Sequence, residues 1–580
     1  MTRGVEPDCG VDLTGFARKD GPSVLAEIVE RVVRNWVTEE QWDPAPEFVF
    51  ERPAEPAHGD YATPFCMQLA KTARRAPRQL AEELKARLEA DAEATALVEA
   101  VEIAGPGFLN FRLRSDAFVK MASDLLEQGD SVGAGRREEP RNILLEYVSV
   151  NPNGPLHVGH ARYAAYGNAL DRLLRFSGER VTTEFYINDY GRQMDMFGRS
   201  VAARYAQSFG VDLEVPEEGY QGGYVADIAA QIRQEVGDRR FEELRERGLE
   251  DASGEAVRFF RERGCQIVLE QMSAELERFG VTFDNWFSET PLHTEGRVRH
   301  AIDRLLATGQ AYEQDEAVWL RTTDYGDDKD RVLIRSNEQP TYFAADIAYH
   351  EDKLLRGYDL LINIWGADHH GYIPRLKAAV EFLAGEPGRL EIVIGQLVSL
   401  QEAGETRQMS TRRGEMVTLA ELLEAIGKDA ARFFLVMRSH DQTLDLDLDL
   451  ARSQSQENPV YYVQYAHARI AGILRNAPPE LEPGLTSDPS LFQTSFEREL
   501  VKKLDEFPHV LMEAADRRHV HRIAGYAQEL AAEFHPFYKN CRVIGSDPAV
   551  ASSRLALCLL TRRVIARCLD LLGVDAPDRM

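Results

Sequence analysis

The chain has 580 residues and a mass of 65.4 kDa, a size that predicts about three or four domains and excludes a small single-module binding protein. Hydrophobic residues make up 44% of the chain, and no run approaches the roughly 18 apolar residues that span a membrane, so we expect no membrane association. The net charge of −27 does not exclude a nucleic acid, because exposed charges are screened over about 8 Å at physiological salt. Six dispersed cysteines without a CxxC pair favour reduced thiols and a cytoplasmic protein.

Residues 1–127 predict an α+β N-terminal domain. Apolar residues recur at helical spacing from Leu25 to Trp36, and the segment GPGFLNFRL (Gly105–Leu113) is typical of a turn followed by a strand. The stretch 128–141 is rich in glycine and charge, which predicts a linker.

A different pattern begins at Asn142. The continuous apolar run NILLEYVSV favours a parallel strand that is buried on both faces, and the loop NPNGPLHVGH leads from it into a helix that ends near Gly178. The segment 359–395 repeats the order of strand, helix and strand. We therefore predict a split Rossmann-type parallel-sheet domain over 142–428, with a largely helical insertion at about 200–340.

Helical patterns dominate the remainder, 429–580, and predict an all-α bundle. The segments with helical spacing are 459–475, 495–516, 518–541 and 551–573. The predicted fold class is thus α/β, with a split Rossmann-type catalytic domain, an α+β N-terminal domain and an all-α C-terminal bundle.

The segment His157-Val158-Gly159-His160 lies between a buried strand and the N-terminus of a helix. Unpaired backbone N–H groups at such a terminus attract phosphate, and two imidazoles spaced i, i+3 can donate to the same oxyanion. Gly159 would leave room for a nucleotide against the backbone. The segment therefore predicts a nucleotide-phosphate site.

The whole stretch EYVSVNPNGPLHVGH, together with FYINDYGRQ (Phe185–Gln193), resembles the signature region of class I aminoacyl-tRNA synthetases, specifically of arginyl-tRNA synthetases. The resemblance continues through INIWGADHHGYIPRLKAA (362–379), RQMSTRRGEMVTL (407–419) and NPVYYVQYAHARI (458–470), and covers nearly the whole chain. It implies activation of L-arginine with ATP, as its Mg²⁺ complex, and transfer to the terminal ribose of tRNA(Arg).

The resemblance further implies that arginine is activated only when tRNA is bound, that the protein is a monomer, and that it holds no zinc. An inactive paralogue that serves as an RNA-binding module is the alternative. The retained residues His157, His160, Glu146 and Asp346 argue against it.

By the same resemblance, the catalytic residues are His157, His160, Arg407 and Arg412. The residues implied for ATP binding are Asn153, Gly154, His157, Gly159, His160, Gly366, Asp368, His369, Gln396, Met409 and Ser410. The second signature of the class, Lys-Met-Ser-Lys, is altered here to Gln408-Met409-Ser410-Thr411, so both lysines are lost from the signature loop 407–414. The arginines of that loop are candidate cations for the triphosphate, and a basic surface loop without a catalytic role is the alternative.

The arginine side chain should be bound by carboxylates, because a guanidinium group is permanently charged and offers five donors in a planar fork. The resemblance assigns this site to Glu146, Asn151, Tyr342, Asp346 and Gln193. Internal salt bridges from Glu146 and Asp346 to arginines of the chain are the rival interpretation.

Two regions are candidates for tRNA binding. Phe108, Asn110 and Phe111 resemble the family region that contacts the tRNA elbow. Tyr461, Tyr465 and Arg469 combine aromatic rings with a cation, which suits stacking of unpaired bases. At helical spacing, core packing is the alternative for the tyrosines.

Overall fold

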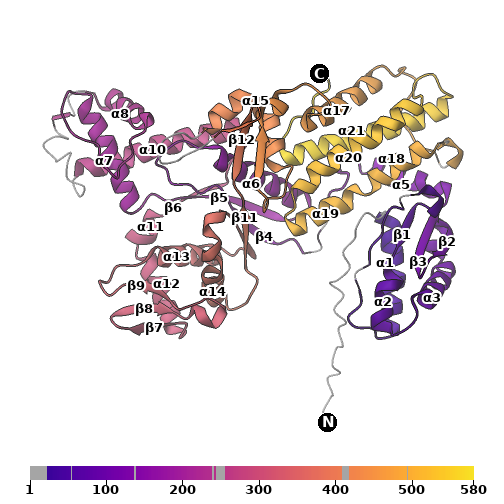
Figure 1. Ribbon diagram of the computed structural model, residues 1–580, viewed down its shortest axis with the longest axis horizontal. Coiled ribbons are helices and arrows are strands. Elements are labelled where there is room, and N and C mark those ends of the chain that lie inside the picture. The colour runs from indigo at the N-terminus through magenta and orange to yellow at the C-terminus, as the bar shows by residue number, and fades with distance from the viewer. Residues whose placement is uncertain are drawn as a thin grey trace, which may run out of the picture. The chain divides into compact units, whose positions relative to one another are not determined.

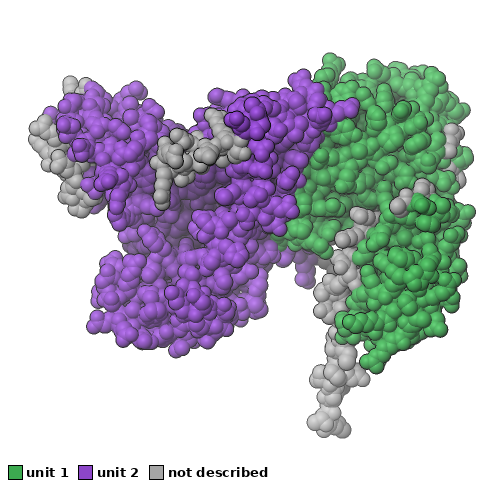
Figure 2. Space-filling model, in the orientation of Figure 1, with its two compact units in different colours: residues 1–136, 461–571, 575–580 green, residues 137–460, 572–574 purple. Residues whose placement is uncertain are grey.

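The computed structural model describes residues 23–46, 48–53, 55–135, 137, 139–237, 241–242, 255–407, 417–486, 488–492 and 494–580. The chain forms two compact units, one of residues 1–136, 461–571 and 575–580, the other of residues 137–460 and 572–574 (Figure 2). The division at 136/137 falls inside the stretch 128–141 that we predicted to be a linker.

The N-terminal part of the first unit is an α+β structure, as predicted. Its antiparallel sheet has the order β1-β3-β2 and is formed by Tyr61–Thr63, Phe108–Leu113 and Val98–Ala104. The accompanying helices are α1 (Ser23–Glu39), α2 (Phe65–Ala73), α3 (Pro77–Ala90), α4 (Ala92–Leu97) and α5 (Ser115–Glu127).

The C-terminal part of the first unit is all-α, which confirms the predicted class. Its helices are α17 (Pro459–Arg475), α18 (Ser495–Asp505), α19 (Phe507–Arg517), α20 (His521–Asn540) and α21 (Pro548–Leu572). The single helix predicted over 495–516 is two helices. Pro508 in the first turn of α19 has no N–H group to continue the hydrogen bonds of α18, so the chain starts a new helix at this point.

The second unit contains a five-stranded parallel sheet with the order β11-β10-β4-β5-β6. Its strands are β4 (Asn142–Glu146), β5 (Arg180–Ile187), β6 (Asn285–Ser288), β10 (Leu360–Gly366) and β11 (Leu390–Gly395), and Figure 1 labels several of them. Helix α6 (Val158–Phe176) connects β4 to β5, and α14 (Ile373–Ala384) connects β10 to β11. The strand order reverses between β4 and β10, where such sheets bind nucleotides. The predicted split Rossmann-type fold is confirmed.

The insertion between the two halves is only partly helical, so our prediction for about 200–340 is wrong in its second half. Helices α7 (Arg192–Gln207), α8 (Gly223–Val236) and α10 (Glu255–Arg278) are followed by β6, which joins the parallel sheet, and by the short helices α11 (Thr290–Thr294) and α12 (Arg297–Ala307). Next come the antiparallel strands β7 (Ala311–Gln314), β8 (Ala317–Leu320) and β9 (Arg331–Ile334). The β7–β8 turn consists of Asp315 and Glu316, with φ of 50° and 58°. This two-residue turn lacks the glycine that normally signals a hairpin.

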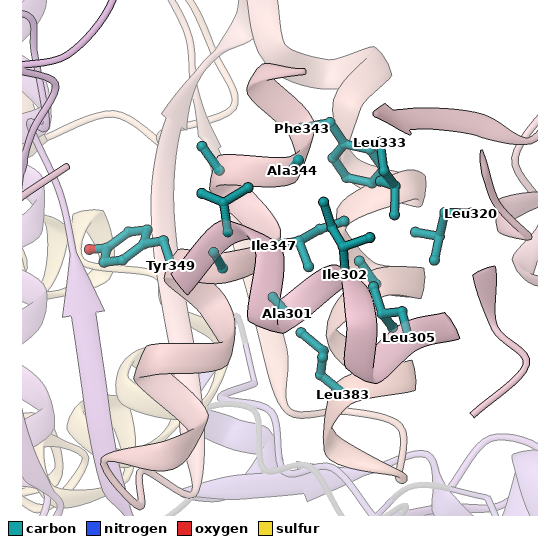
Figure 3. Packing of buried hydrophobic residues seen from close by; sticks show 14 of the residues in the cluster. Ala301, Ile302, Leu305, Leu320, Leu333, Phe343, Ala344, Ile347, Tyr349 and Leu383 are labelled. Carbon is teal, nitrogen blue, oxygen red and sulfur yellow. The ribbon is translucent and has the colours of Figure 1, made fainter. Parts of the chain in front are cut away.

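Helix α13 (Tyr342–Leu355) is held by a hydrophobic core that also contains α12 and α14 (Figure 3). Ile302, Leu305, Phe343, Ile347 and Leu383 are all buried in this core. One face of α13 is thereby fixed, so the side chains on its other faces have defined positions relative to the sheet.

The second unit extends to Val460, beyond our predicted domain boundary at 428/429. That boundary lies next to Gly427, whose non-helical φ of 77° kinks α15 (Leu419–Val436), and α15 packs against α6. Arg432 is fully buried in this helix and donates hydrogen bonds to the carbonyl oxygen of Phe279 (2.9 Å) and to Asn168 Oδ1 (2.7 Å). A buried guanidinium group requires such acceptors, and both acceptors belong to the second unit. The strands β12 (Val398–Glu402), β13 (Glu405–Arg407) and β14 (Leu444–Asp447) and helix α16 (Leu448–Arg452) complete this unit.

Candidate active site

His157 and His160 lie at the N-terminus of α6 with their rings stacked at a centroid distance of 3.4 Å. The Gly159 N–H group donates to His157 Nδ1 (3.1 Å), and the His157 N–H group donates to His160 Nδ1 (3.4 Å). Because Nδ1 accepts in both rings, each neutral imidazole carries its proton on Nε2. Each ring therefore has one N–H donor that is not used by the helix cap.

Burial lowers the pKa of His157 to about 4 and that of His160 to about 3, with His157 contributing to the second shift. Both imidazoles are therefore uncharged at pH 7. They can donate hydrogen bonds to a phosphate group, but they do not supply positive charge. Positive potential at this site comes from the dipole of α6, because the N–H groups of Val158 and Gly159 already donate hydrogen bonds within the protein.

Gly159 has a structural reason that differs from the one we predicted. A Cβ atom at this position would lie 3.0 Å from His157 Cε1. The glycine therefore gives the His157 ring room to fold over the first turn of α6, and room for a nucleotide at Gly159 stays a prediction.

The chain returning from the signature loop pairs directly with the histidine segment. Val158 donates its N–H to the carbonyl oxygen of Val417 (3.1 Å), and Leu419 donates to that of Leu156 (2.9 Å). At the other end of the loop, Arg407 lies in β13 with its backbone paired to Leu400 in β12. Three predicted site residues, Met409, Ser410 and Arg412, lie outside the described residues.

Three carboxylates converge at the carboxyl ends of the strands. Glu146 ends β4 and is 6% exposed, while Glu289 follows β6 and is 5% exposed. Asp346, on α13, interacts electrostatically with both. Burial and these two carboxylates raise the pKa of Asp346 to about 7, although a hydrogen bond from the Tyr372 hydroxyl opposes the shift. The cluster therefore offers a site for a cation.

Lys353 is the cation already present in this cluster. It is completely buried, and its Nζ lies 2.5 Å from Glu146 Oε2. The rival interpretation of an internal ion pair thus holds for Glu146, but the partner is a lysine. Lys353 offsets the charge of Glu146, and the cluster also contains the carboxylates of Asp346 and Glu289. Sequence reasoning missed Lys353, although it lies seven residues after Asp346 on the same helix, which places both near one face.

Glu289 was also missed, because it comes from the insertion and no local pattern marks it. Its carboxylate is oriented by His293, whose Nε2 lies 3.0 Å from Glu289 Oε1, and by the hydroxyl group of Tyr186. The ring of Tyr190 stacks on His293 at 3.9 Å. These contacts fix a carboxylate that is adjacent to the end of β6.

The structure brings Asn151 and Gln193 together, as the predicted arginine site requires. Asn151 Nδ2 donates to Gln193 Oε1 at 2.6 Å. Tyr342 begins α13, one turn before Asp346, and is 69% exposed.

Two tyrosines of the insertion hold the loop that precedes the histidines. Asn153 Nδ2 donates to the hydroxyl oxygen of Tyr220 (2.8 Å), and the Tyr224 hydroxyl donates to the Asn153 carbonyl oxygen (2.8 Å). A Cβ atom at Gly154 would lie 3.3 Å from the Tyr224 hydroxyl.

The remaining predicted ATP-binding residues follow β10 and β11. A Cβ atom at Gly366 would lie 2.6 Å from Asp368 Oδ1, so the glycine permits this close approach. The side chains of Asp368 and His369 are 80% and 58% exposed and lie 3.4 Å apart. The backbone of Gln396 is fixed by His440 and by the buried Arg162, with donor–acceptor distances of 2.8 and 2.9 Å.

One tRNA-binding prediction is wrong. Phe111 is fully buried and its ring packs against Phe50 at 5.3 Å, so its side chain belongs to the core of the N-terminal domain. Alternation along β3 turns Phe111 inward and places Phe108 on the opposite face, where it is half-buried. Asn110, on the same face as Phe108, is 8% exposed.

Tyr461, Tyr465 and Arg469 form a continuous stripe on α17. The two tyrosine rings are nearly parallel at 6.0 Å, and Arg469 Nη2 donates to the Tyr465 hydroxyl oxygen (2.9 Å). The Arg469 guanidinium also lies 5.0 Å from the ring centroid of Tyr538, which is 42% exposed. The stripe is half-buried, so core packing accounts for only part of these side chains.

Comparison with known proteins decides the family. Residues 23–113 match the arginyl-tRNA synthetase N-terminal domain, residues 121–454 the catalytic domain of class I tRNA synthetases (R), and residues 463–580 the DALR anticodon-binding domain. The chain belongs to the arginyl-tRNA synthetase family. The catalytic-domain match ends at residue 454 and the anticodon-binding match begins at 463, on either side of the structural division at 460/461.

Individual relatives agree with this assignment. The arginine–tRNA ligase of Thioalkalivibrio sulfidiphilus is 46% identical and aligned over 93% of this chain and 96% of its own length. That of Bacillus subtilis is 44% identical, over 96% and 98%. The solved structure of Thermus thermophilus arginyl-tRNA synthetase superposes with a TM-score of 0.75 at 25% identity, covering 96% of this chain and 100% of that one.

Proposed function

We propose that the pair Asp346 and Glu289 binds the guanidinium group of L-arginine, beside an ATP site built on His157 and His160. The chain is a class I arginine–tRNA ligase, which forms arginyl-adenylate from ATP and passes the arginyl group to tRNA(Arg). One observation supports this residue assignment. Among the residues that the structure describes, the carboxylates of Glu146, Glu289 and Asp346 cluster at the carboxyl ends of β4 and β6 around a single cation, Lys353. A permanently charged, bidentate donor fits two carboxylates better than an ammonium group does.

Asn151 and Gln193 are placed to bind the α-amino and carboxyl end of arginine, because their amides meet at the loop between β4 and α6. Tyr342 covers the arginine side chain from the first turn of α13. Glu146 remains part of the site through its ion pair with Lys353. This end of the pocket holds the substrate carboxylate toward the α-phosphate.

ATP enters as its Mg²⁺ complex along the edge formed by Asn153, Gly154, Gly366, Asp368, His369 and Gln396. The neutral imidazoles of His157 and His160 donate from Nε2 to phosphate oxygens, where negative charge grows during attack by the arginine carboxylate. Arg407 and Arg412, at the start and within the signature loop, supply positive charge in place of the two missing lysines. Pairing of 417–419 with 156–158 supports this role, because it ties the end of the loop to the histidine segment.

tRNA is bound through two surfaces of the first unit. Phe108 and Asn110 of β3 contact the tRNA elbow, and the stripe of Tyr461, Tyr465 and Arg469, extended by Tyr538, stacks unpaired bases of the anticodon region. The enzyme acts as a cytoplasmic monomer. No helix in the described part of the chain has the length and apolar character needed to cross a bilayer.

Pyrophosphate exchange tests both the activity and its dependence on tRNA. The purified chain is assayed with arginine and labelled pyrophosphate, without tRNA, with tRNA(Arg), and with tRNA(Arg) whose terminal ribose is oxidised. We expect exchange with tRNA(Arg) and with its oxidised form, but not without tRNA. The oxidised form should support exchange because it permits activation and blocks transfer. Exchange without tRNA would contradict the requirement for tRNA, and no exchange under any condition would contradict the activity and favour an inactive paralogue.

A further inference from the structure

A row of buried polar residues crosses four neighbouring strands beneath the arginine pocket. Asn363 on β10 is in register with Glu146 on β4, Glu146 with Glu184 on β5, and Glu184 with Asn285 on β6. Asn363, Glu146 and Glu184 are 1%, 6% and 0% exposed. Parallel strands buried on both faces normally carry apolar residues, so this row needs specific partners.

Helix α13 and the residue after it supply those partners. Arg356 donates two hydrogen bonds to Glu184, at 2.6 and 2.9 Å, and the Tyr349 hydroxyl donates a third at 2.7 Å. Tyr349 belongs to the hydrophobic cluster that includes Ile302 and Leu305, and its hydroxyl group points away from their side chains (Figure 3). Glu184 is therefore fully compensated by groups that do not belong to the pocket.

Lys353 serves the other carboxylate of the row. Its Nζ donates to Glu146 Oε2 at 2.5 Å and to Asn363 Oδ1 at 3.0 Å. Asn363 Nδ2 then donates to His350 Nε2 (2.9 Å), and His350 Nδ1 donates to the carbonyl oxygen of Asp346 (2.7 Å). Lys353 Nζ, Asn363 Nδ2 and His350 Nδ1 thus each donate to an acceptor within this series of hydrogen bonds. Burial lowers the pKa of His350, which keeps its ring neutral. This series of hydrogen bonds ends at Asp346, the residue that we assign to the guanidinium group of arginine.

We infer, on the basis of the proposed arginine pocket, that Lys353 is a positioning residue: it forms an ion pair with Glu146 and keeps Asp346 ionised, so that the pocket accepts arginine at neutral pH. The groups that face Asp346 are Glu146 from β4, Glu289 from the start of α11, Tyr186 from β5, Tyr372 from the 3-10 helix η4 (Ala367–Tyr372), and Lys353 from its own helix. Lys353 is the one cation among these named groups. Without it, Asp346 faces only carboxylates and neutral hydroxyl groups, and its protonated form is favoured.

The test is the pH dependence of the KM for arginine in tRNA-supported pyrophosphate exchange, measured for wild type, Lys353→Met, Glu146→Gln and the double variant. Arginine binding requires ionised Asp346, so KM falls as the pH rises through its pKa. We expect Lys353→Met to move the midpoint of this profile upward by about one pH unit, which raises KM about fivefold at pH 7. Glu146→Gln should lower the midpoint of the pH profile, and the double variant should return the midpoint close to the wild-type value.

Two measurements separate this effect from damage to the fold. The KM for ATP should change less than about twofold in Lys353→Met, and the control Lys377→Met, an exposed lysine of α14, should behave as wild type. If Lys353→Met does not fold, the comparison of Glu146→Gln with the double variant decides, because neither leaves an unpaired Glu146 charge. In that comparison the loss of Lys353 must raise the midpoint.

An unchanged midpoint in Lys353→Met, or in the double variant relative to Glu146→Gln, would overturn the inference. The proposed function would survive that result as long as the wild type shows arginine-dependent exchange. Absence of exchange in the wild type itself would instead remove the proposed function, and with it the pocket on which the role of Lys353 rests.

Discussion

The hydroxyl group of Tyr372 donates a hydrogen bond to the carboxylate of Asp346, 26 residues earlier in the chain. Asp346 lies on α13 among the arginine-site carboxylates, whereas Tyr372 ends the 3-10 helix η4 that contains Asp368 and His369. This bond joins the two halves of the proposed site, because it links the acidic pocket to the segment after β10. It also stabilises the ionised form of Asp346.

Removing that bond should weaken arginine binding. In Tyr372→Phe, the pKa of Asp346 rises because a donor to the carboxylate is lost; a loss of about 1 kcal/mol should increase the KM for arginine roughly threefold at pH 7. The increase should shrink at pH 8.5, where Asp346 is ionised in both forms. Steady-state exchange at the two pH values measures this, and an equal increase at both would assign Tyr372 to packing.

The wild-type enzyme should bind arginine better as the pH rises. With a pKa of about 7, Asp346 changes from mostly protonated at pH 6 to mostly ionised at pH 8, while the guanidinium of arginine stays charged throughout. We expect the KM for arginine to fall roughly tenfold over this range. Asp346→Asn removes the titrating group, so its KM should be high and independent of pH, and its KM for ATP should match the wild type.

Loss of either histidine should slow activation and leave the fold intact. His157→Asn retains a helix-capping side chain but lacks an imidazole Nε2–H, and His160→Ala removes the second donor. We expect each to lower the rate of tRNA-supported exchange by roughly 10²–10³. Thermal unfolding should remain cooperative in both. Near-normal turnover in one variant would mean that its imidazole does not contact the reacting phosphates.

Phe108 and Phe111 should behave in opposite ways. Phe108→Ala changes a half-buried residue on the outer face of β3, so we expect the KM for tRNA(Arg) to rise with little change in melting temperature. Phe111→Ala empties a core position and should cost about 3–5 kcal/mol of stability. Calorimetry and aminoacylation kinetics on both variants check this. A tRNA-specific defect in a stable Phe111→Ala protein would restore our original prediction.

The stripe on α17 should contribute to tRNA binding through stacking. We expect Tyr538→Ala and Tyr465→Ala each to weaken tRNA(Arg) binding by about 1–3 kcal/mol, without changing the KM for arginine. Tyr325→Ala is the matched control, because Tyr325 is 41% exposed, close to the 42% of Tyr538, but lies in the insertion. Filter binding at fixed salt gives the affinities. Equal, small effects in all three variants would assign the stripe to packing.

The sequence by itself determined the fold class and the family, and it predicts the position of the nucleotide site. These depend on local signals: the apolar run of β4, the histidines at the start of α6 and the helical spacing after residue 459 are properties of short contiguous segments. The resemblance also predicts that Asn151 lies near Gln193, as the structure has it, and it assigns Asp346 to the proposed arginine pocket.

Only the tertiary structure decided the charge of the pocket and the orientation of β3. Glu146 and Lys353 are 207 residues apart, and Glu289 reaches the site because β6 joins the parallel sheet next to β5. No local pattern specifies which of 95 acidic residues forms an ion pair with a buried lysine, because that depends on the packing of α13 over the strand ends. In the same way, both faces of β3 carry a phenylalanine, and burial against Phe50 selected Phe111 for the core.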